Sequence, residues 1–174
     1  MEIKDRIKRI SQYFKEMKII NIDGAQVIYI NVKFPQGWTI DENIEEFADG
    51  YETVLGERGV TVSGGEPLFQ SDFTAELLKK CRVNGIHTAI ETSGFADEKA
   101  LLTVLDYCDL VLFDIKETDE EMHKRYTGVS LMPILENLKL INKNKIPFII
   151  RAPIIPTLND RESHFNALRA IRES

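Results

Sequence analysis

A chain of 174 residues is long enough for one hydrophobic core and short for two domains of ordinary size. Its 43% hydrophobic and 29% charged residues are typical of a globular domain, and no window approaches the roughly 20 apolar residues of a membrane span. A net charge of −6 argues against a nucleic-acid surface, which needs clustered Lys and Arg. We therefore expect a single cytoplasmic domain that binds neither a membrane nor a nucleic acid.

The first segment, residues 1–24, predicts an amphipathic helix followed by a turn. Over residues 2–18 the apolar residues recur at helical spacing, and acidic and basic residues are interleaved between them. Residues 21–24, Asn-Ile-Asp-Gly, are typical of a turn. The segment has no continuous apolar stretch, so we expect a surface docking helix rather than a signal sequence.

The remaining chain, residues 25–174, alternates short apolar runs with amphipathic helical segments. This alternation predicts a parallel sheet with crossover helices, an α/β fold of about five βα units. The predicted strands are residues 27–34, 59–62, 86–91, 110–114 and 147–151. The predicted helices include residues 40–55, 73–83 and 161–172.

A glycine-rich turn follows the second predicted strand, with the sequence Ser63-Gly64-Gly65-Glu66. Residues without Cβ adopt positive φ easily and let main-chain N–H and C=O groups approach a ligand closely. Glu66 adds an acceptor for a cationic amine, so the turn suits a small zwitterion. The structural alternative is a tight βα turn whose carboxylate complements a helix dipole.

The later predicted strands also end in polar side chains. Asp114 and Lys116 alternate about Ile115, so period-two geometry places both on one face of a strand. The other strand-end groups are Glu91, Thr92, Ser93 and the cation Arg151. Strand carboxyl ends carry the chemistry of parallel barrels, so these groups are predicted to line one pocket. Ordinary salt bridges at a barrel mouth are the alternative.

These motifs, in this order, resemble the radical S-adenosylmethionine (SAM) superfamily, and within it the activating enzymes of glycyl radical enzymes such as pyruvate formate-lyase. The resemblance spans residues 39–160. It rests on Thr39-Ile-Asp-Glu42, the block at residues 59–67, Glu91-Thr-Ser-Gly94, Asp114-Ile-Lys116 and Arg151-Ala-Pro-Ile-Ile-Pro156. It implies a partial (β/α) barrel, SAM as cofactor and a glycyl radical enzyme as partner.

The resemblance also implies a role for individual residues. The turn at residues 63–66 would hold the amino group of SAM, with Asp114 and Lys116 beside its methionine moiety. Glu91 and Thr92 stand where the family has Asp-Thr near the ribose and a monovalent cation. A ligand with a carboxylate, an ammonium and a sulfonium needs partners of both signs, which these side chains provide.

The cysteine content departs from the family. Radical SAM enzymes hold a [4Fe–4S] cluster with three thiolates in a C-x3-C-x2-C loop, but this chain has only Cys81 and Cys108, on separate predicted elements. Residues 35–39, where that loop would lie, contain no thiol. The sequence therefore predicts no metal ligands and no catalytic residue, and a chain that is inactive alone.

The number of predicted strands also departs from the family. The resemblance implies a further strand after residues 147–151, so the barrel is expected to be incomplete. An open strand edge pairs readily with another chain, and this predicts self-association.

Three functions agree with these patterns. The first is an incomplete activating enzyme of a glycyl radical enzyme. The second is a non-catalytic module that binds SAM or the partner protein. The third is an unrelated barrel lyase that uses Lys116 as a Schiff-base amine, which requires the neutral form of that amine.

Overall fold

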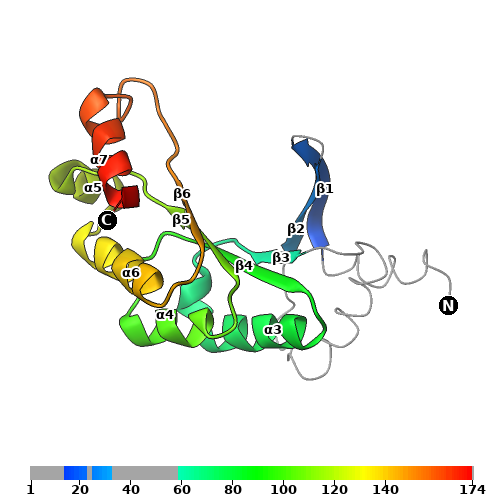
Figure 1. The fold of residues 1–174 in the computed structure, drawn as a ribbon. Helices are drawn as coiled ribbons and strands as arrows, with labels where there is room; N and C mark the ends of the chain where they lie inside the picture. Colours follow the sequence, from blue (N-terminus) through cyan, green and yellow to red (C-terminus); the bar gives the residue numbers. More distant parts are fainter. Residues whose placement is uncertain (1–13, 23–24, 33–58, 174) are drawn as a thin grey trace.

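The computed structural model describes residues 14–22, 25–32 and 59–173 (Figure 1). Within these ranges the chain forms a two-stranded antiparallel hairpin and a four-stranded parallel sheet. The helix predicted at residues 40–55, the link at residues 35–39 and the Thr39 motif lie outside the described residues. For the described part, the predicted α/β fold with a parallel sheet is confirmed.

The N-terminal part of the described chain is a hairpin of β1 (Phe14–Ile22) and β2 (Ala25–Val32). The helix predicted for residues 2–18 is therefore wrong from residue 14 onward, and its earlier part lies outside the described residues. The predicted strand at residues 27–34 is present, but it pairs with β1 and not with the parallel sheet. Of the turn predicted at residues 21–24, the first two residues belong to β1. Both strands are rich in Ile and Val, whose branched side chains favour extended backbone over the weak helical periodicity.

The parallel sheet contains the other four predicted strands, each displaced by at most one residue. They are β3 (Gly59–Val62), β4 (His87–Thr92), β5 (Leu110–Asp114) and β6 (Phe148–Arg151), and they lie in that order. The helical elements are η1 (Pro67–Gln70), α3 (Ser71–Val83), α4 (Glu98–Leu105), α5 (Glu120–Thr127), α6 (Met132–Lys143) and α7 (Glu162–Glu173). Each strand of the sheet is therefore followed by at least one helix, as parallel connections require.

The two faces of the parallel sheet differ in burial. Ile90, Val111 and Phe113 are fully buried and pack against side chains of α3, α4 and α6, which lie along one side of the sheet (Figure 1). Their sequence neighbours Glu91 and Asp114 point to the opposite face, because side chains alternate along a strand. That face is only partly covered in the described part of the chain. The charged strand-end groups therefore lie on the face away from these helices.

Side-chain caps fix where two strand-to-helix loops end. The Asp97 carboxylate accepts from the Ala100 N–H at 2.7 Å and begins α4. Asp119 accepts from the Met122 N–H at 2.9 Å and begins α5. Such N-caps each contribute about 1 kcal/mol and hold the preceding loop in one conformation. The loops that follow β4 and β5 are thereby tied to the helices behind the sheet.

Strand β6 lies at one edge of the parallel sheet, and among the described residues it pairs only with β5. Ile149, on its less covered face, is 51% exposed. Self-association through this edge stays a prediction. In the described part of the chain, no helix has the length and apolar character needed to cross a bilayer.

The loop after β4 depends on a glycine at residue 94. Gly94 has φ +73°, and a Cβ added there would lie 2.3 Å from Cζ of Phe113. The Asn137 side chain of α6 donates to the carbonyls of Gly94 and Ala96, at 2.8 Å each. The loop therefore packs directly against the Phe113 ring and is held there by hydrogen bonds from Asn137.

We expect Gly94→Ala to lower the free energy of unfolding by roughly 2–5 kcal/mol. Of this, about 1–2 kcal/mol is the cost of a left-handed conformation, and about 1–3 kcal/mol comes from the clash with Phe113. Gly85→Ala is the matched control, because Gly85 has φ +72° and open space where its Cβ would lie. Urea unfolding of both variants measures the difference, and equal losses would contradict the clash.

Candidate functional site

The turn after β3 presents its main chain to solvent. Gly64 and Gly65 have φ values of +99° and +55°, and no atom lies within 4 Å of a Cβ built on either. Ser63 and both glycines are exposed. The positive φ values, and not crowding, are therefore what favours glycine here, and the main-chain polar groups are accessible to a ligand.

The Glu66 carboxylate joins the ends of β3 and β4. Its Oε1 accepts from Thr92 Oγ1 at 2.6 Å and from the Leu68 N–H at 3.2 Å. Its Oε2 accepts from the N–H and the Oγ of Ser93, at 3.0 and 2.6 Å. Both oxygens are thus already held by protein donors. Thr92 and Ser93 hold Glu66 in this geometry, and their contact with a ligand stays a prediction.

A row of charges of alternating sign follows the ends of β4, β6 and β5. Arg151 Nη2 lies 2.7 Å from Glu91 Oε1, and Arg151 Nε lies 3.2 Å from Asp114 Oδ1. Lys116 Nζ lies 2.9 Å from Asp114 Oδ2, which agrees with the prediction that the two share a face. The row exists because β5 and β6 pair with Asp114 opposite Arg151. The salt bridges named as the structural alternative are thus formed.

Part of this row still has capacity for a ligand. Asp114 Oδ1 is buried, and among the described residues it has an ion-pair contact with Arg151 Nε at 3.2 Å but no hydrogen bond. The side chains of Lys116 and Arg151 are 46% and 43% exposed, so each cation can also reach outward. One free acceptor and two half-exposed cations match a ligand that carries an ammonium and a carboxylate.

The predicted site residues therefore lie together along the carboxyl edge of four adjacent strands. Glu91 connects the contacts around Glu66 with the row of charges. It precedes Thr92 in the chain and contacts Arg151 across the sheet. The loop at residues 154–160 follows β6 and carries the exposed side chains of Ile154, Ile155 and Leu158.

The sequence patterns did not single out four buried or partly buried polar residues behind this edge. They are Glu117, Asn159, Arg161 and His164. Burial raises the pKa of the Glu117 carboxyl, but hydrogen bonds from Arg161 and from two main-chain amides outweigh it and leave the pKa below its usual value. Of these four residues, Glu117 is the one whose sequence position gave a signal, because it directly follows the predicted site residue Lys116.

The two cysteines lie away from the site. Cys81 is buried in α3, and Cys108 is buried just before β5, where its Sγ donates to the Leu110 carbonyl at 3.0 Å. Burial raises the pKa of each thiol to about 11. Among the described residues, no three His, Cys, Asp or Glu side chains are placed to share a metal ion.

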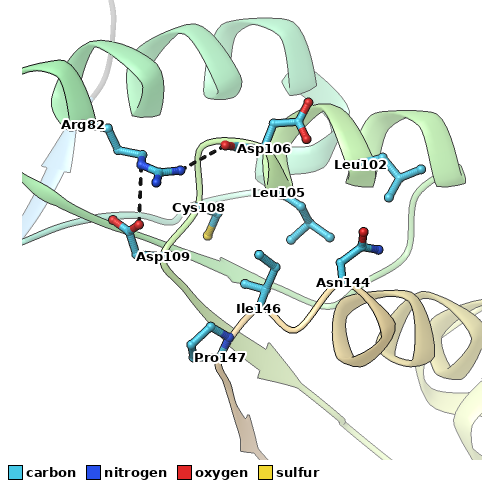
Figure 2. Close-up of a pocket in the computed structure, with 9 residues that line it drawn as sticks. All are labelled: Arg82, Leu102, Leu105, Asp106, Cys108, Asp109, Asn144, Ile146 and Pro147. Atoms are coloured by element: carbon cyan, nitrogen blue, oxygen red, sulfur yellow. Dashed lines mark hydrogen bonds and ion pairs between the residues drawn. The ribbon is translucent and has the colours of Figure 1, made fainter.

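A hollow of about 490 Å³ lies at the opposite end of the sheet, where β5 and β6 begin (Figure 2). Arg82 lines this hollow. Its guanidinium donates to the Asp106 carbonyl at 3.0 Å and forms an ion pair with Asp109 at 3.5 Å. The rest of its lining is mainly apolar and includes Leu105 and Ile146. None of the predicted site residues lines this hollow, so it is separate from the candidate site.

The free energy of unfolding is expected to fall as the pH drops below about 6.5, the ordinary pKa of an unfolded histidine. Burial lowers the pKa of His164, so the folded chain takes up this proton less readily than the unfolded chain. The contribution of the neutral His164 ring to stability is therefore fully present above that pH. It is lost as the pH falls through the folded pKa of His164. Urea unfolding between pH 7.5 and 5.5 measures the slope.

His164→Gln should flatten this slope, since it removes the buried titrating ring. His87→Gln is the control, because His87 lies at the exposed amino end of β4. Equal slopes in the two variants would contradict the assignment to His164.

Comparisons with known proteins agree with the parallel α/β fold. The sequence profile of the Radical SAM superfamily matches residues 5–167. The chain is 46% identical over 124 residues to the (2S)-3-sulfopropanediol dehydratase activating enzyme of Klebsiella oxytoca, covering 70% of this chain and 39% of that protein. It is 37% identical over 129 residues to the 4-hydroxyphenylacetate decarboxylase activating enzyme of Clostridium scatologenes, covering 73% and 41%.

Among solved structures, a domain of pyruvate-formate lyase-activating enzyme from Bacteroides vulgatus superposes with a TM-score of 0.60 at 33% identity. The alignment covers 65% of this chain and 70% of that domain. The chain thus spans about two fifths of the length of the curated relatives and most of one crystallised domain.

Proposed function

Because the chain belongs to the radical SAM superfamily, we propose that the carboxyl ends of its parallel strands bind S-adenosylmethionine for the activation of a glycyl radical enzyme. The observation that carries this proposal is the row Glu91, Arg151, Asp114 and Lys116, which lies at the same edge of the sheet as the exposed glycine turn. The relatives named above are activating enzymes, which supports a protein partner of this kind.

Each part of the site matches one part of the cofactor. The exposed main chain at residues 63–65 and the Glu66 carboxylate suit the ammonium group, which would share Glu66 with Thr92 and Ser93 or displace one of their hydroxyls. Lys116 and Arg151 suit the carboxylate of the methionine moiety. The free Asp114 Oδ1 is an acceptor for a cationic or hydroxyl group. We propose that the ligand carboxylate binds the exposed sides of Lys116 and Arg151 while their ion pairs with Asp114 and Glu91 stay formed.

The thiols of this chain do not fit the [4Fe–4S] cluster that supplies the electron for SAM cleavage in the superfamily. Three thiolates from one loop are needed, and the chain has two cysteines in all, both buried and on different elements. We therefore propose that this chain binds SAM and contributes to partner recognition, and that it does not generate a radical alone. A non-catalytic binding module is the limiting case of this proposal.

The geometry disfavours the alternative of a lyase with Lys116 as a Schiff-base amine. Lys116 donates to Asp114 at 2.9 Å, and a neighbouring carboxylate stabilises the charged ammonium. Carbonyl attack needs the neutral amine, so this ion pair works against the chemistry. Sodium borohydride in the presence of a carbonyl compound should therefore leave Lys116 unmodified.

Calorimetric titration of SAM into the purified chain tests the proposal. We expect saturable binding, weakened at least about tenfold by Lys116→Ala and by Arg151→Ala, because each removes a cation that faces the ligand carboxylate. Lys143→Ala is the matched control, since Lys143 is exposed at the end of α6, close to the amino end of β6 and not to its carboxyl end. No saturable binding by the unaltered chain would refute the proposal for this chain.

Anaerobic treatment with iron and sulfide tests the statement about the cluster. We expect the purified chain to retain no stoichiometric iron or acid-labile sulfide, because its thiols have pKa values of about 11 and do not share a loop. A Cys81→Ala, Cys108→Ala double variant serves as the background measurement. Retention of four irons per chain, lost in that double variant, would contradict this expectation.

A further inference from the structure

The chain leaves β5 with alternate side chains on opposite sides. Asp114 and Lys116 face the candidate site, whereas Ile115 and Glu117 are 1% and 0% exposed. A buried carboxylate costs several kcal/mol unless it is paired and hydrogen-bonded. The residue directly after Lys116 therefore depends on specific partners.

Those partners come from the segment after β6. Glu117 Oε1 accepts from Arg161 Nη2 at 2.5 Å, and also from the N–H groups of Thr118 and Asp119 at 2.7 and 3.0 Å. Arg161 Nη1 donates in turn to the Leu158 carbonyl at 2.8 Å. One buried ion pair thus ties the exit of β5 to the start of α7.

Asn159 makes a second connection, to the main chain of Lys116 itself. Its side chain is buried, and its Nδ2 donates to the Lys116 carbonyl at 3.0 Å and to the Pro153 carbonyl at 2.9 Å. Its Oδ1 accepts from the Ile155 N–H at 2.7 Å. The loop is held closed by the same amide group that holds Lys116.

The cluster is not arranged for the greatest stability. Glu117 Oε2 and His164 Nε2 are both buried with no hydrogen-bond partner in the described part of the chain, which lowers stability. His164 Nδ1 instead lies 2.8 Å from Thr118 Oγ1. Apolar residues of similar size would stabilise such a core at least as well. The polar cluster therefore contributes a specific geometry and not additional stability.

We infer that Glu117 and Asn159 are positioning residues: Asn159 holds the Lys116 carbonyl and Glu117 holds the main chain just after it, so that the ammonium of Lys116 stays on Asp114. A displacement of this main chain changes the position from which the Lys116 side chain reaches Asp114, and with it the 2.9 Å hydrogen bond. The effect on cofactor affinity rests on the proposed function. The effect on the ion pair does not.

The experiment measures SAM affinity by calorimetry in Glu117→Gln, Asn159→Ala and a control, Asp109→Asn. Asp109 accepts from Thr88 at the opposite end of the sheet, so its loss weakens the fold without touching the site. We expect about tenfold weaker binding in the first two variants and less than a twofold change in the control, with urea unfolding showing that all three are folded.

A double-mutant cycle separates positioning from general destabilisation. If Glu117 acts through Lys116, Glu117→Gln in a Lys116→Ala background should cause no further loss of affinity, because the residue that it positions is gone. Additive losses would overturn the inference, as would losses no larger than those of Asp109→Asn. Neither variant of the pair is expected to change the stoichiometry of binding.

A second readout works without the cofactor. The NMR signal of the Lys116 ammonium reports its hydrogen bond to Asp114, and Asp114→Asn gives the reference for a broken pair. We expect Glu117→Gln and Asn159→Ala to shift the signal toward that reference, and an unchanged signal would overturn the inference. A chain that binds no SAM but shows this shift would refute the proposed function and support the positioning roles.

Discussion

The parallel pairing of β5 with β6 is the constraint on which the candidate site depends. It places Arg151 opposite Asp114, and from there the guanidinium also reaches Glu91 on β4, so three strands contribute to one row of charges. A shift by one residue would turn Arg151 toward the helices and leave an unpaired cation in the core. Lys116 lies two residues after Asp114 and reaches it because side chains alternate along the strand.

The side of the sheet away from the site maintains this register. Fully buried side chains such as Phe113 fix the strands against the helices, and Gly94 lets the loop after β4 lie directly on the Phe113 ring. That loop carries Ser93, which holds Glu66. The exposed glycine turn and the charge row are therefore linked through the core, although each consists of only a few side chains on different strands.

The membership in the radical SAM superfamily and the cysteine content describe two different aspects of this protein. The charges and the exposed main chain at the strand ends suit the zwitterionic ligand that we propose. The buried thiols, whose pKa values are near 11, belong to the hydrophobic core and to the wall of a separate hollow. The proposed ligand binding therefore depends on other residues than the two thiols.

The sequence by itself determined the parallel strands from β3 to β6 and the residues at their ends, because apolar runs and glycine turns are local signals. It misassigned residues 14–18, where helical spacing competed with the extended preference of Ile and Val in the hairpin. Tertiary structure alone decided that Glu66 binds Thr92 and Ser93, that Arg151 bridges Glu91 and Asp114, and that Asn159 holds Lys116. These contacts join residues far apart in the chain, and their geometry follows from strand register and side-chain packing, which no local pattern encodes.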